Sequence, residues 1–171
     1  MANILVNKNA SLLEVILNRP DDGNALSLEL IEELNEILEN YQHDLEIKLV
    51  TITGQGDKFF IAGGDIKELN AVRSDSDIDD MIKLGRKTLD MIRYYPVPVI
   101  ALINGYALGG GAELAMACDY RLAVEKASIG FVHSTLNITT AWGGVIDLIY
   151  LLGHTKALLT LIEGKTIKAK E

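Results

Sequence analysis

The sequence predicts an α/β fold, because strands and amphipathic helices follow one another in a repeating order. Short runs of apolar and β-branched residues mark the strands. The first four are residues 3–7, 12–18, 47–53 and 97–103. Two longer stretches, starting near Ser27 and near Ile78, carry apolar residues at helical spacing. The chain has 171 residues, of which 49% are hydrophobic, so we expect residues 1–171 to form a single domain with a sizeable core.

The first half of the chain indicates where its elements begin and end. Residues 8–11 are the expected turn between the first two strands. Ser27 is the expected N-cap of the first helix. The apolar face of that helix consists of Leu30, Ile31, Leu34, Ile37 and Leu38. Residues 73–77 are polar and charged and are expected to form an exposed loop. The second helix should end near Tyr94, because the prolines that follow cannot continue it.

The second half repeats the pattern. Residues 112–117 are expected to be helical and residues 120–124 to form a strand. Two further helices are expected over residues 148–152 and 155–162. The last residues, 166–171, look like the start of another helix.

The charge and the cysteine content restrict the class of function. The net charge is −8, which disfavours nucleic acid as a general partner, because an acidic chain repels phosphate backbones. The single cysteine, Cys118, excludes an internal disulfide and is expected to be a buried thiol. We find no signal peptide and no apolar run long enough to cross a bilayer. A cytoplasmic protein without a membrane partner is therefore expected.

The most informative segment is a glycine cluster, Gly109-Gly110-Gly111, between a predicted strand and a predicted helix. Glycines there let a ligand approach the main chain, and the helix start presents unpaired N–H groups to an anion. A phosphate-binding P-loop would need Lys and then Ser or Thr where Ala112 and Glu113 stand. The glycine spacing of a dinucleotide site does not occur either. An oxyanion site is the better interpretation, and the alternative is that the glycines serve only tight helix–sheet packing.

A second segment, residues 62–67, has the same character. The strand ending at Ile61 meets small residues, Ala62-Gly63-Gly64, and then Asp65-Ile66-Lys67 at a predicted helix start. Asp65 could cap that helix and Lys67 could simply be solvated, so this segment alone is a weak signal.

Taken together, these segments resemble the crotonase superfamily, also known as the enoyl-CoA hydratase/isomerase family. The matching blocks are residues 18–20, 24–27, 62–67, 104–114, 117–121 and 142–144. The resemblance covers essentially the whole chain. It implies a spiral of repeated strand–strand–helix turns, assembled as a homo-oligomer, a trimer or a hexamer, in the full-length form. It also implies an acyl-CoA thioester as the partner, with no metal and no cofactor beyond the coenzyme A of the substrate.

The resemblance also implies site residues. Gly64 and Gly110 would donate their backbone N–H groups to the thioester carbonyl and its enolate, and Glu113 would be a catalytic carboxylate. The implied substrate-binding residues are Ala25, Leu26, Ala62, Gly64, Asp65, Ile66, Lys67 and Gly110. Lys67 would lie near the nucleotide end of coenzyme A.

The sequence departs from the family at one catalytic position. Hydratases of the family use a second glutamate, and the isomerases keep it, where this chain has His133. His133 could act as an acid or as a hydrogen-bond donor, or it could be a partly buried histidine with no catalytic task. Residues 129–133 and 142–144 are similar to a branch that decarboxylates ethylmalonyl-CoA and methylmalonyl-CoA. Decarboxylation needs an oxyanion hole and a proton donor but no second carboxylate.

Three functions follow from this comparison. The first is an acyl-CoA lyase that decarboxylates a short 2-carboxyacyl-CoA, and the second is an enoyl-CoA hydratase that uses Glu113. The third, of another class, is a catalytically silent homologue that binds acyl-CoA or a protein. The chain ends at Glu171, so the C-terminal helices that complete the acyl pocket and build the family's trimer are expected to be missing.

Overall fold

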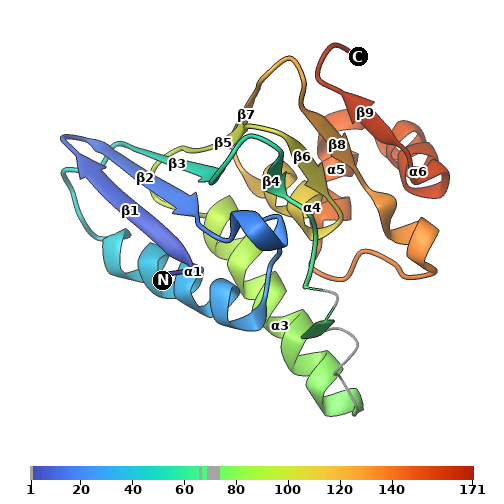
Figure 1. The fold of residues 1–171 in the computed structure, drawn as a ribbon, viewed down its shortest axis with the longest axis horizontal. Helices are drawn as coiled ribbons and strands as arrows, with labels where there is room; N and C mark the ends of the chain where they lie inside the picture. The colour runs from blue at the N-terminus through green and yellow to red at the C-terminus, as the bar shows by residue number, and fades with distance from the viewer. Residues whose placement is uncertain (1, 66, 69–73) are drawn as a thin grey trace.

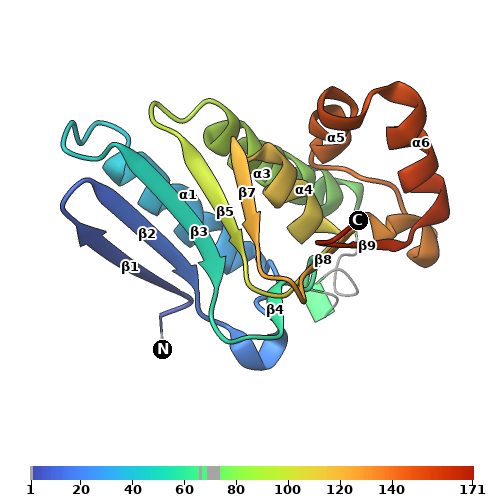
Figure 2. The same cartoon turned by 90° about the horizontal axis from the view of Figure 1, so that it is seen from above.

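The computed structural model describes residues 2–65, 67–68 and 74–171. Within them the strands form two sheets, and helices cover one face of the larger sheet (Figures 1 and 2). The larger sheet has the order β1-β2-β3-β5-β7, with β1 antiparallel to β2 and all other neighbours parallel. Its strands are β1 Ile4–Asn9, β2 Leu12–Leu17, β3 Leu49–Gly54, β5 Val99–Ile103 and β7 Tyr120–Ala123.

The smaller sheet has the order β4-β6-β8-β9. Its strands are β4 Phe59–Ile61, β6 Tyr106–Leu108, β8 Ser128–Gly130 and β9 Thr166–Lys168. The helices are η1 Pro20–Asp22, α1 Leu28–Tyr41, α3 Asp75–Arg93, α4 Gly110–Ala117, η2 Val132–Leu136, α5 Gly144–Leu152 and α6 His154–Glu163. Helices α1, α3 and α4 lie along the larger sheet, and α5 and α6 lie beside β8 and β9 (Figure 2).

The chain repeats one unit, which confirms the predicted spiral. A strand of the larger sheet, a strand of the smaller sheet and a helix follow one another as β3–β4–α3, then β5–β6–α4, then β7–β8–α5. The first unit is abbreviated: in place of a strand of the smaller sheet, Leu26 makes an isolated parallel bridge to Gly64 before α1 begins. Each of the other three units therefore passes through the smaller sheet before its helix starts.

Helix α1 forms as its sequence predicts. The hydroxyl of Ser27 accepts a hydrogen bond from the N–H of Leu30 at 3.2 Å, which caps the helix. Four of the five predicted apolar residues are fully buried, and Ile37 is half-buried against the core. Burial of this stripe holds α1 on the sheet.

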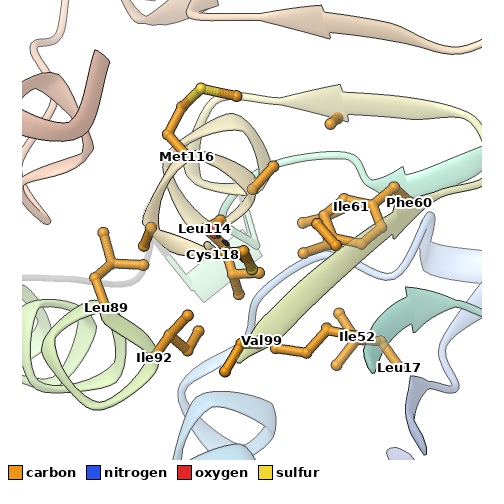
Figure 3. Close-up of a cluster of buried hydrophobic side chains, with 14 of the residues drawn as sticks. Leu17, Ile52, Phe60, Ile61, Leu89, Ile92, Val99, Leu114, Met116 and Cys118 are labelled. Atoms are coloured by element: carbon orange, nitrogen blue, oxygen red, sulfur yellow. Dashed lines mark hydrogen bonds between the residues drawn. The ribbon is translucent and has the colours of Figure 1, made fainter. Parts of the chain in front are cut away.

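The core lies between the larger sheet and the helices that cover it. Leu17, Ile52 and Val99 reach it from β2, β3 and β5, while Leu89 and Leu114 approach from α3 and α4 (Figure 3). The Cys118 thiol lies among these apolar side chains and is 3% exposed, as expected of a buried thiol.

The predicted loop over residues 73–77 was wrong in its described part. Ser74 is the N-cap of α3, and its hydroxyl accepts from the N–H of Asp77, while the Asp77 carboxylate accepts from the N–H of Ser74. This capping box satisfies two of the N–H groups at the helix start, so the polar residues 75–77 form the first turn of α3. Residue 73 lies outside the described residues.

The predicted helix start over residues 166–171 was also wrong. Residues 166–168 form β9, which pairs antiparallel with β8, with Ile167 opposite Ile129. The N–H of Ala169 continues the pairing by donating to the carbonyl of Ala127 at 3.0 Å. The open edge of β8 offers unpaired backbone groups, and these hydrogen bonds decide the conformation of the segment.

Candidate active site

The first glycine segment lies where β4 leaves the smaller sheet. The N–H of Leu26 donates to the carbonyl of Gly63 at 2.9 Å, and the carbonyl of Leu26 accepts from the N–H of Asp65 at 3.0 Å. This bridge uses the groups on either side of Gly64 and leaves the N–H of Gly64 itself unused. No acceptor among the described residues binds that N–H.

The second glycine segment starts α4. The structure begins this helix at Gly110, two residues before the predicted start at Ala112, so the N–H of Gly110 lies in the first turn without an intrahelical partner. Gly109 precedes it with φ +52°, a left-handed conformation that favours glycine. Its N–H donates to Gly130 of β8 at 2.9 Å, which holds the turn against the smaller sheet.

The pairing of β4 with β6 brings the two glycine segments together. Ile61 pairs with Ala107, so the residues that follow each strand run side by side. A β-carbon placed on Gly63 would lie 3.5 Å from the Leu108 carbonyl oxygen, and one on Gly109 would lie 3.8 Å from the Gly63 Cα. The N–H groups of Gly64 and Gly110, for which the described part of the chain offers no acceptor, therefore belong to adjoining turns, an arrangement suited to an oxyanion.

A buried carboxylate and an imidazole lie next to these turns. Glu113, on α4, is 2% exposed, and His133, on η2, is 9% exposed. Nε2 of His133 lies 3.2 Å from Oε1 of Glu113, and the N–H of Gly144 donates to Oε2 at 2.9 Å. Nε2 is also 3.8 Å from a β-carbon position on Gly109. Nδ1 of His133 is buried and has no hydrogen-bond partner among the described residues.

The segment from Trp142 to Gly144 packs against Glu113 and Gly110. A β-carbon on Gly144 would lie 2.5 Å from Cβ of Glu113, so only glycine lets the N–H of residue 144 reach the carboxylate. The Trp142 indole packs on Gly110, where a β-carbon would lie 2.6 Å from Cζ3. Residues 142–144 are one of the blocks that resemble the family, but the sequence alone predicts no role for Trp142 or Gly144.

Arg19 contacts two of the residues predicted to bind coenzyme A, Ala25 and Asp65. Its guanidinium contacts Asp65 Oδ2 at 3.1 Å and Asp22 Oδ2 at 3.2 Å, and it donates to the carbonyl of Ala25 at 2.8 Å. Sequence reasoning assigned Arg19 no role, because no local signal links it to Asp65. The guanidinium joins the loop after β2 to the predicted coenzyme A segment.

Asp65 is buried, and burial alone would raise the pKa of its carboxyl group. The hydrogen bond from Arg19 and the backbone N–H groups of Lys67 and Glu68 outweigh that effect, so the pKa of Asp65 lies below its ordinary value. The Lys67 N–H donates to Asp65 Oδ1 at 3.0 Å, which confirms that Asp65 caps the turn after it.

The remaining predicted groove residues surround the same loops. Ala25 and Leu26 are buried, and the N–H of Ala62 donates to the carbonyl of Gly23 at 2.9 Å. The Lys67 side chain is 85% exposed, with Nζ 3.4 Å from Asp22 Oδ1, so its charge faces solvent. Ile66 lies outside the described residues.

An apolar cavity of about 420 Å³ lies between β8, β9, α5 and α6, lined by Ile129, Phe131, Leu148 and Ile167 among others. None of Gly64, Gly110, Glu113 and His133 lines it. This cavity therefore does not coincide with the candidate site, which is marked by the N–H groups of Gly64 and Gly110 and by the buried pair of Glu113 and His133.

Residues 7–171 match the family model described as enoyl-CoA hydratase/isomerase. The chain belongs to the enoyl-CoA hydratase/isomerase family. It is 36% identical to the short-chain-enoyl-CoA hydratase of Clostridium acetobutylicum, over 99% of this chain and 64% of that protein. It is 37% identical to the crotonyl-CoA hydratase of Syntrophomonas wolfei, over 99% of this chain and 65% of that protein.

A solved enoyl-CoA hydratase from Bacillus anthracis has the same fold, with a TM-score of 0.94 and 39% identity over 99% of this chain and 66% of that one. The chain thus spans less than two thirds of the length of each of these family members. That coverage agrees with the expectation that the C-terminal helical part is missing.

Two further findings concern the described part of this family member. It contains no group of three or more His, Cys, Asp and Glu side chains placed to hold a metal ion. None of its helices combines the length and apolar character that crossing a lipid bilayer requires.

Proposed function

We propose that this member of the enoyl-CoA hydratase/isomerase family is an acyl-CoA lyase that works through a thioester enolate. The N–H groups of Gly64 and Gly110 would bind the thioester oxygen and stabilise the negative charge that develops on it. The support is that neither N–H group has an acceptor among the described residues and that the two belong to adjoining turns. Each such donor contributes roughly 10²–10³ in rate, so the pair could supply most of the catalysis.

The coenzyme A part of the substrate would lie along the loops that Arg19 and Asp65 join. Ala25, Leu26 and Ala62 would flank it, and Lys67 would contribute its charge near the nucleotide end. The exposure of Lys67 supports this role, because its ammonium group faces solvent beside Asp22 and can reach a phosphate from there.

We propose decarboxylation of a short 2-carboxyacyl-CoA as the reaction. The observation that carries this proposal is the contact of His133 with Glu113, at a position where the family's hydratases have a second glutamate. In this reaction the bond from Cα to the carboxylate breaks, CO₂ leaves, and the electron pair passes into the enolate. A proton from His133 then reaches Cα and gives the saturated acyl-CoA, so the step consumes one proton. The buried carboxylate of Glu113 would orient His133 and repel the leaving carboxylate.

Hydration of an enoyl-CoA is the second candidate. The support is that two relatives at 36% and 37% identity are named a short-chain-enoyl-CoA hydratase and a crotonyl-CoA hydratase. Glu113, fixed by the Gly144 N–H, would then position the water and move its proton.

A screen with crotonyl-CoA, methylmalonyl-CoA and ethylmalonyl-CoA, read by mass, tests the proposal. We expect butyryl-CoA from ethylmalonyl-CoA and propionyl-CoA from methylmalonyl-CoA, with little 3-hydroxybutyryl-CoA from crotonyl-CoA. Conversion of crotonyl-CoA alone would replace decarboxylation by hydration. Tight binding without any conversion would leave a silent acyl-CoA-binding protein.

Calorimetry with a non-reactive acyl-CoA tests the groove separately. Lys67→Ala should weaken binding, and more so at low salt, because the contact is between exposed charges. Lys126→Ala, which removes an exposed lysine paired with Asp57 at 3.2 Å, is the matched control. Equal affinity of wild type and Lys67→Ala would remove Lys67 from the site. Light scattering tests the homo-oligomer, a trimer or a hexamer, that we expect of the full-length form.

A further inference from the structure

The indole of Trp142 spans the gap between α3 and α4. A β-carbon on Gly85 of α3 would lie 2.4 Å from Nε1 and 2.5 Å from Cδ1 of this side chain. On the other side, a β-carbon on Gly110 of α4 would lie 2.6 Å from Cζ3. All three distances are shorter than any real carbon contact, so the indole can lie there only because both positions are glycine.

This side chain adjoins the reacting end of the proposed substrate. Gly110 is the residue whose N–H would bind the thioester oxygen, and the indole packs directly against it. Two residues further along, the N–H of Gly144 holds the carboxylate of Glu113. A thioester bound through Gly110 and processed beside Glu113 would therefore have its α-carbon and the next carbons near the indole.

We infer that Trp142 limits the size of the acyl group, so that the site accepts short acyl chains and excludes long ones. This inference rests on the proposed function. The indole is a rigid plane held between two helices, and it is only half-buried, so part of its surface is exposed. A long acyl chain would clash with the indole, which cannot move away because it is held between the two helices. One methylene that does not fit such a pocket changes the specificity by about tenfold or more.

Trp142 is the only tryptophan of the chain, so its fluorescence reports on this side chain alone. The experiment titrates the protein with coenzyme A, butyryl-CoA and octanoyl-CoA, which neither proposed reaction converts. Fluorescence and calorimetry are recorded together. We expect coenzyme A to bind without changing the Trp142 emission and butyryl-CoA to change it. Octanoyl-CoA should bind at least about tenfold more weakly than butyryl-CoA.

The variants change the Trp142 side chain itself or displace it from its position. Trp142→Ala should bind octanoyl-CoA as tightly as butyryl-CoA, and Trp142→Phe should be intermediate. Gly85→Ala displaces the indole from the α3 side and should change the ratio of the two affinities, although Trp142, Gly110 and Glu113 themselves are not substituted. Tyr94→Ala removes an aromatic side chain that is 78% exposed at the end of α3 and should leave the ratio unchanged. If Trp142→Ala does not fold, Trp142→Phe and Gly85→Ala decide.

The results separate the inference from the function on which it rests. Equal affinity of the wild type for butyryl-CoA and octanoyl-CoA, with unchanged emission, would overturn the role of Trp142 and leave the proposed lyase intact. Failure of the wild type to bind coenzyme A or any of its thioesters would overturn the proposed function, and the inference with it.

Discussion

Nε2 of His133 lies 3.2 Å from Oε1 of Glu113, and both side chains are buried. The other carboxylate oxygen is taken by the Gly144 N–H at 2.9 Å, so both oxygens of Glu113 have a fixed neighbour. Burial keeps solvent from screening the two groups, so their interaction is stronger than it would be at the surface. The pair therefore behaves as one unit, and its two members should be tested together.

Substitution of each member should distinguish the two proposed reactions. If the protein decarboxylates, His133→Ala should lower kcat on ethylmalonyl-CoA more than Glu113→Gln does, because the imidazole supplies the proton. If it hydrates, Glu113→Gln should cost roughly 10²–10⁴ in rate on crotonyl-CoA. Steady-state kinetics of both variants on both substrates make the comparison. Unchanged rates in both variants would remove the pair from catalysis.

The buried ion pair between α3 and α5 should matter for stability. Arg93 donates to Asp147 through Nε at 2.8 Å and through Nη2 at 2.7 Å, and the Asp147 side chain is 10% exposed. Asp147→Ala leaves the arginine without its buried partner and should lower the free energy of unfolding by about 3 kcal/mol. We expect a value at the low end of the usual range for a broken buried pair, because Arg93 keeps its contact with Asp90.

The matched control for that pair is Glu39→Ala. Glu39 pairs with Lys87 at 2.7 Å, but both side chains are about half exposed, and we expect a loss of about 0–1 kcal/mol. Urea unfolding followed by circular dichroism gives both values. Equal losses in the two variants would show that burial of the Arg93–Asp147 pair contributes nothing.

Asp65 should make stability depend on pH at the acid end. Its pKa is lower in the folded chain than the value of about 4 in the unfolded chain, so its contribution is fully present above about pH 4. That contribution is lost as the pH falls through the lower, folded pKa. We expect Asp65→Asn to be less stable than wild type at neutral pH and the gap to narrow under acid conditions.

Urea midpoints measured across the acid range test this prediction. Asp57→Asn, which removes a carboxylate that is 93% exposed, is the control and should follow the wild-type curve. A constant gap between Asp65→Asn and wild type at every pH would contradict the linkage to Asp65.

Cys118 should be inert in the folded protein. Burial raises the pKa of its thiol to about 12, and the side chain is 3% exposed, so neither the thiolate nor access is available at neutral pH. A coloured disulfide reagent should react with one thiol per chain in urea and with none in buffer on the same timescale. Rapid reaction in buffer would mean that α4 opens readily.

Local signals predicted most elements, and the errors came from one overlooked local signal and from contacts between residues distant in sequence. Ser27 and the apolar stripe from Leu30 onwards lie within one helix, so spacing alone predicted α1. Ser74 and Asp77 also form a local signal, but the run of charges hid the capping box. The conformation of residues 166–168 depends on the free edge of β8, which nothing in their own sequence indicates.

Some residues of the candidate site could be predicted from the sequence, and others could not. Gly64, Gly110, Glu113 and His133 were predicted from motif blocks, and the structure brings the last two into contact. The Gly144 N–H could not be predicted, because its hydrogen bond to Glu113 depends on how α5 packs on α4. Arg19 was missed for the same reason, since Asp65 is distant in sequence and close only through the Leu26 bridge.

The order of the larger sheet has a consequence for how the chain reaches this state. Only β1 and β2 close locally, as a hairpin with Asn9 opposite Leu12. Each later strand adds in parallel after a long crossover, as when Val50 of β3 meets Val99 of β5, and such closures are slow. Because the sheet order β1-β2-β3-β5-β7 follows the chain, every strand finds its neighbour already synthesised. The sheet can therefore grow during translation, from the first hairpin outward, in the order in which the ribosome delivers the strands.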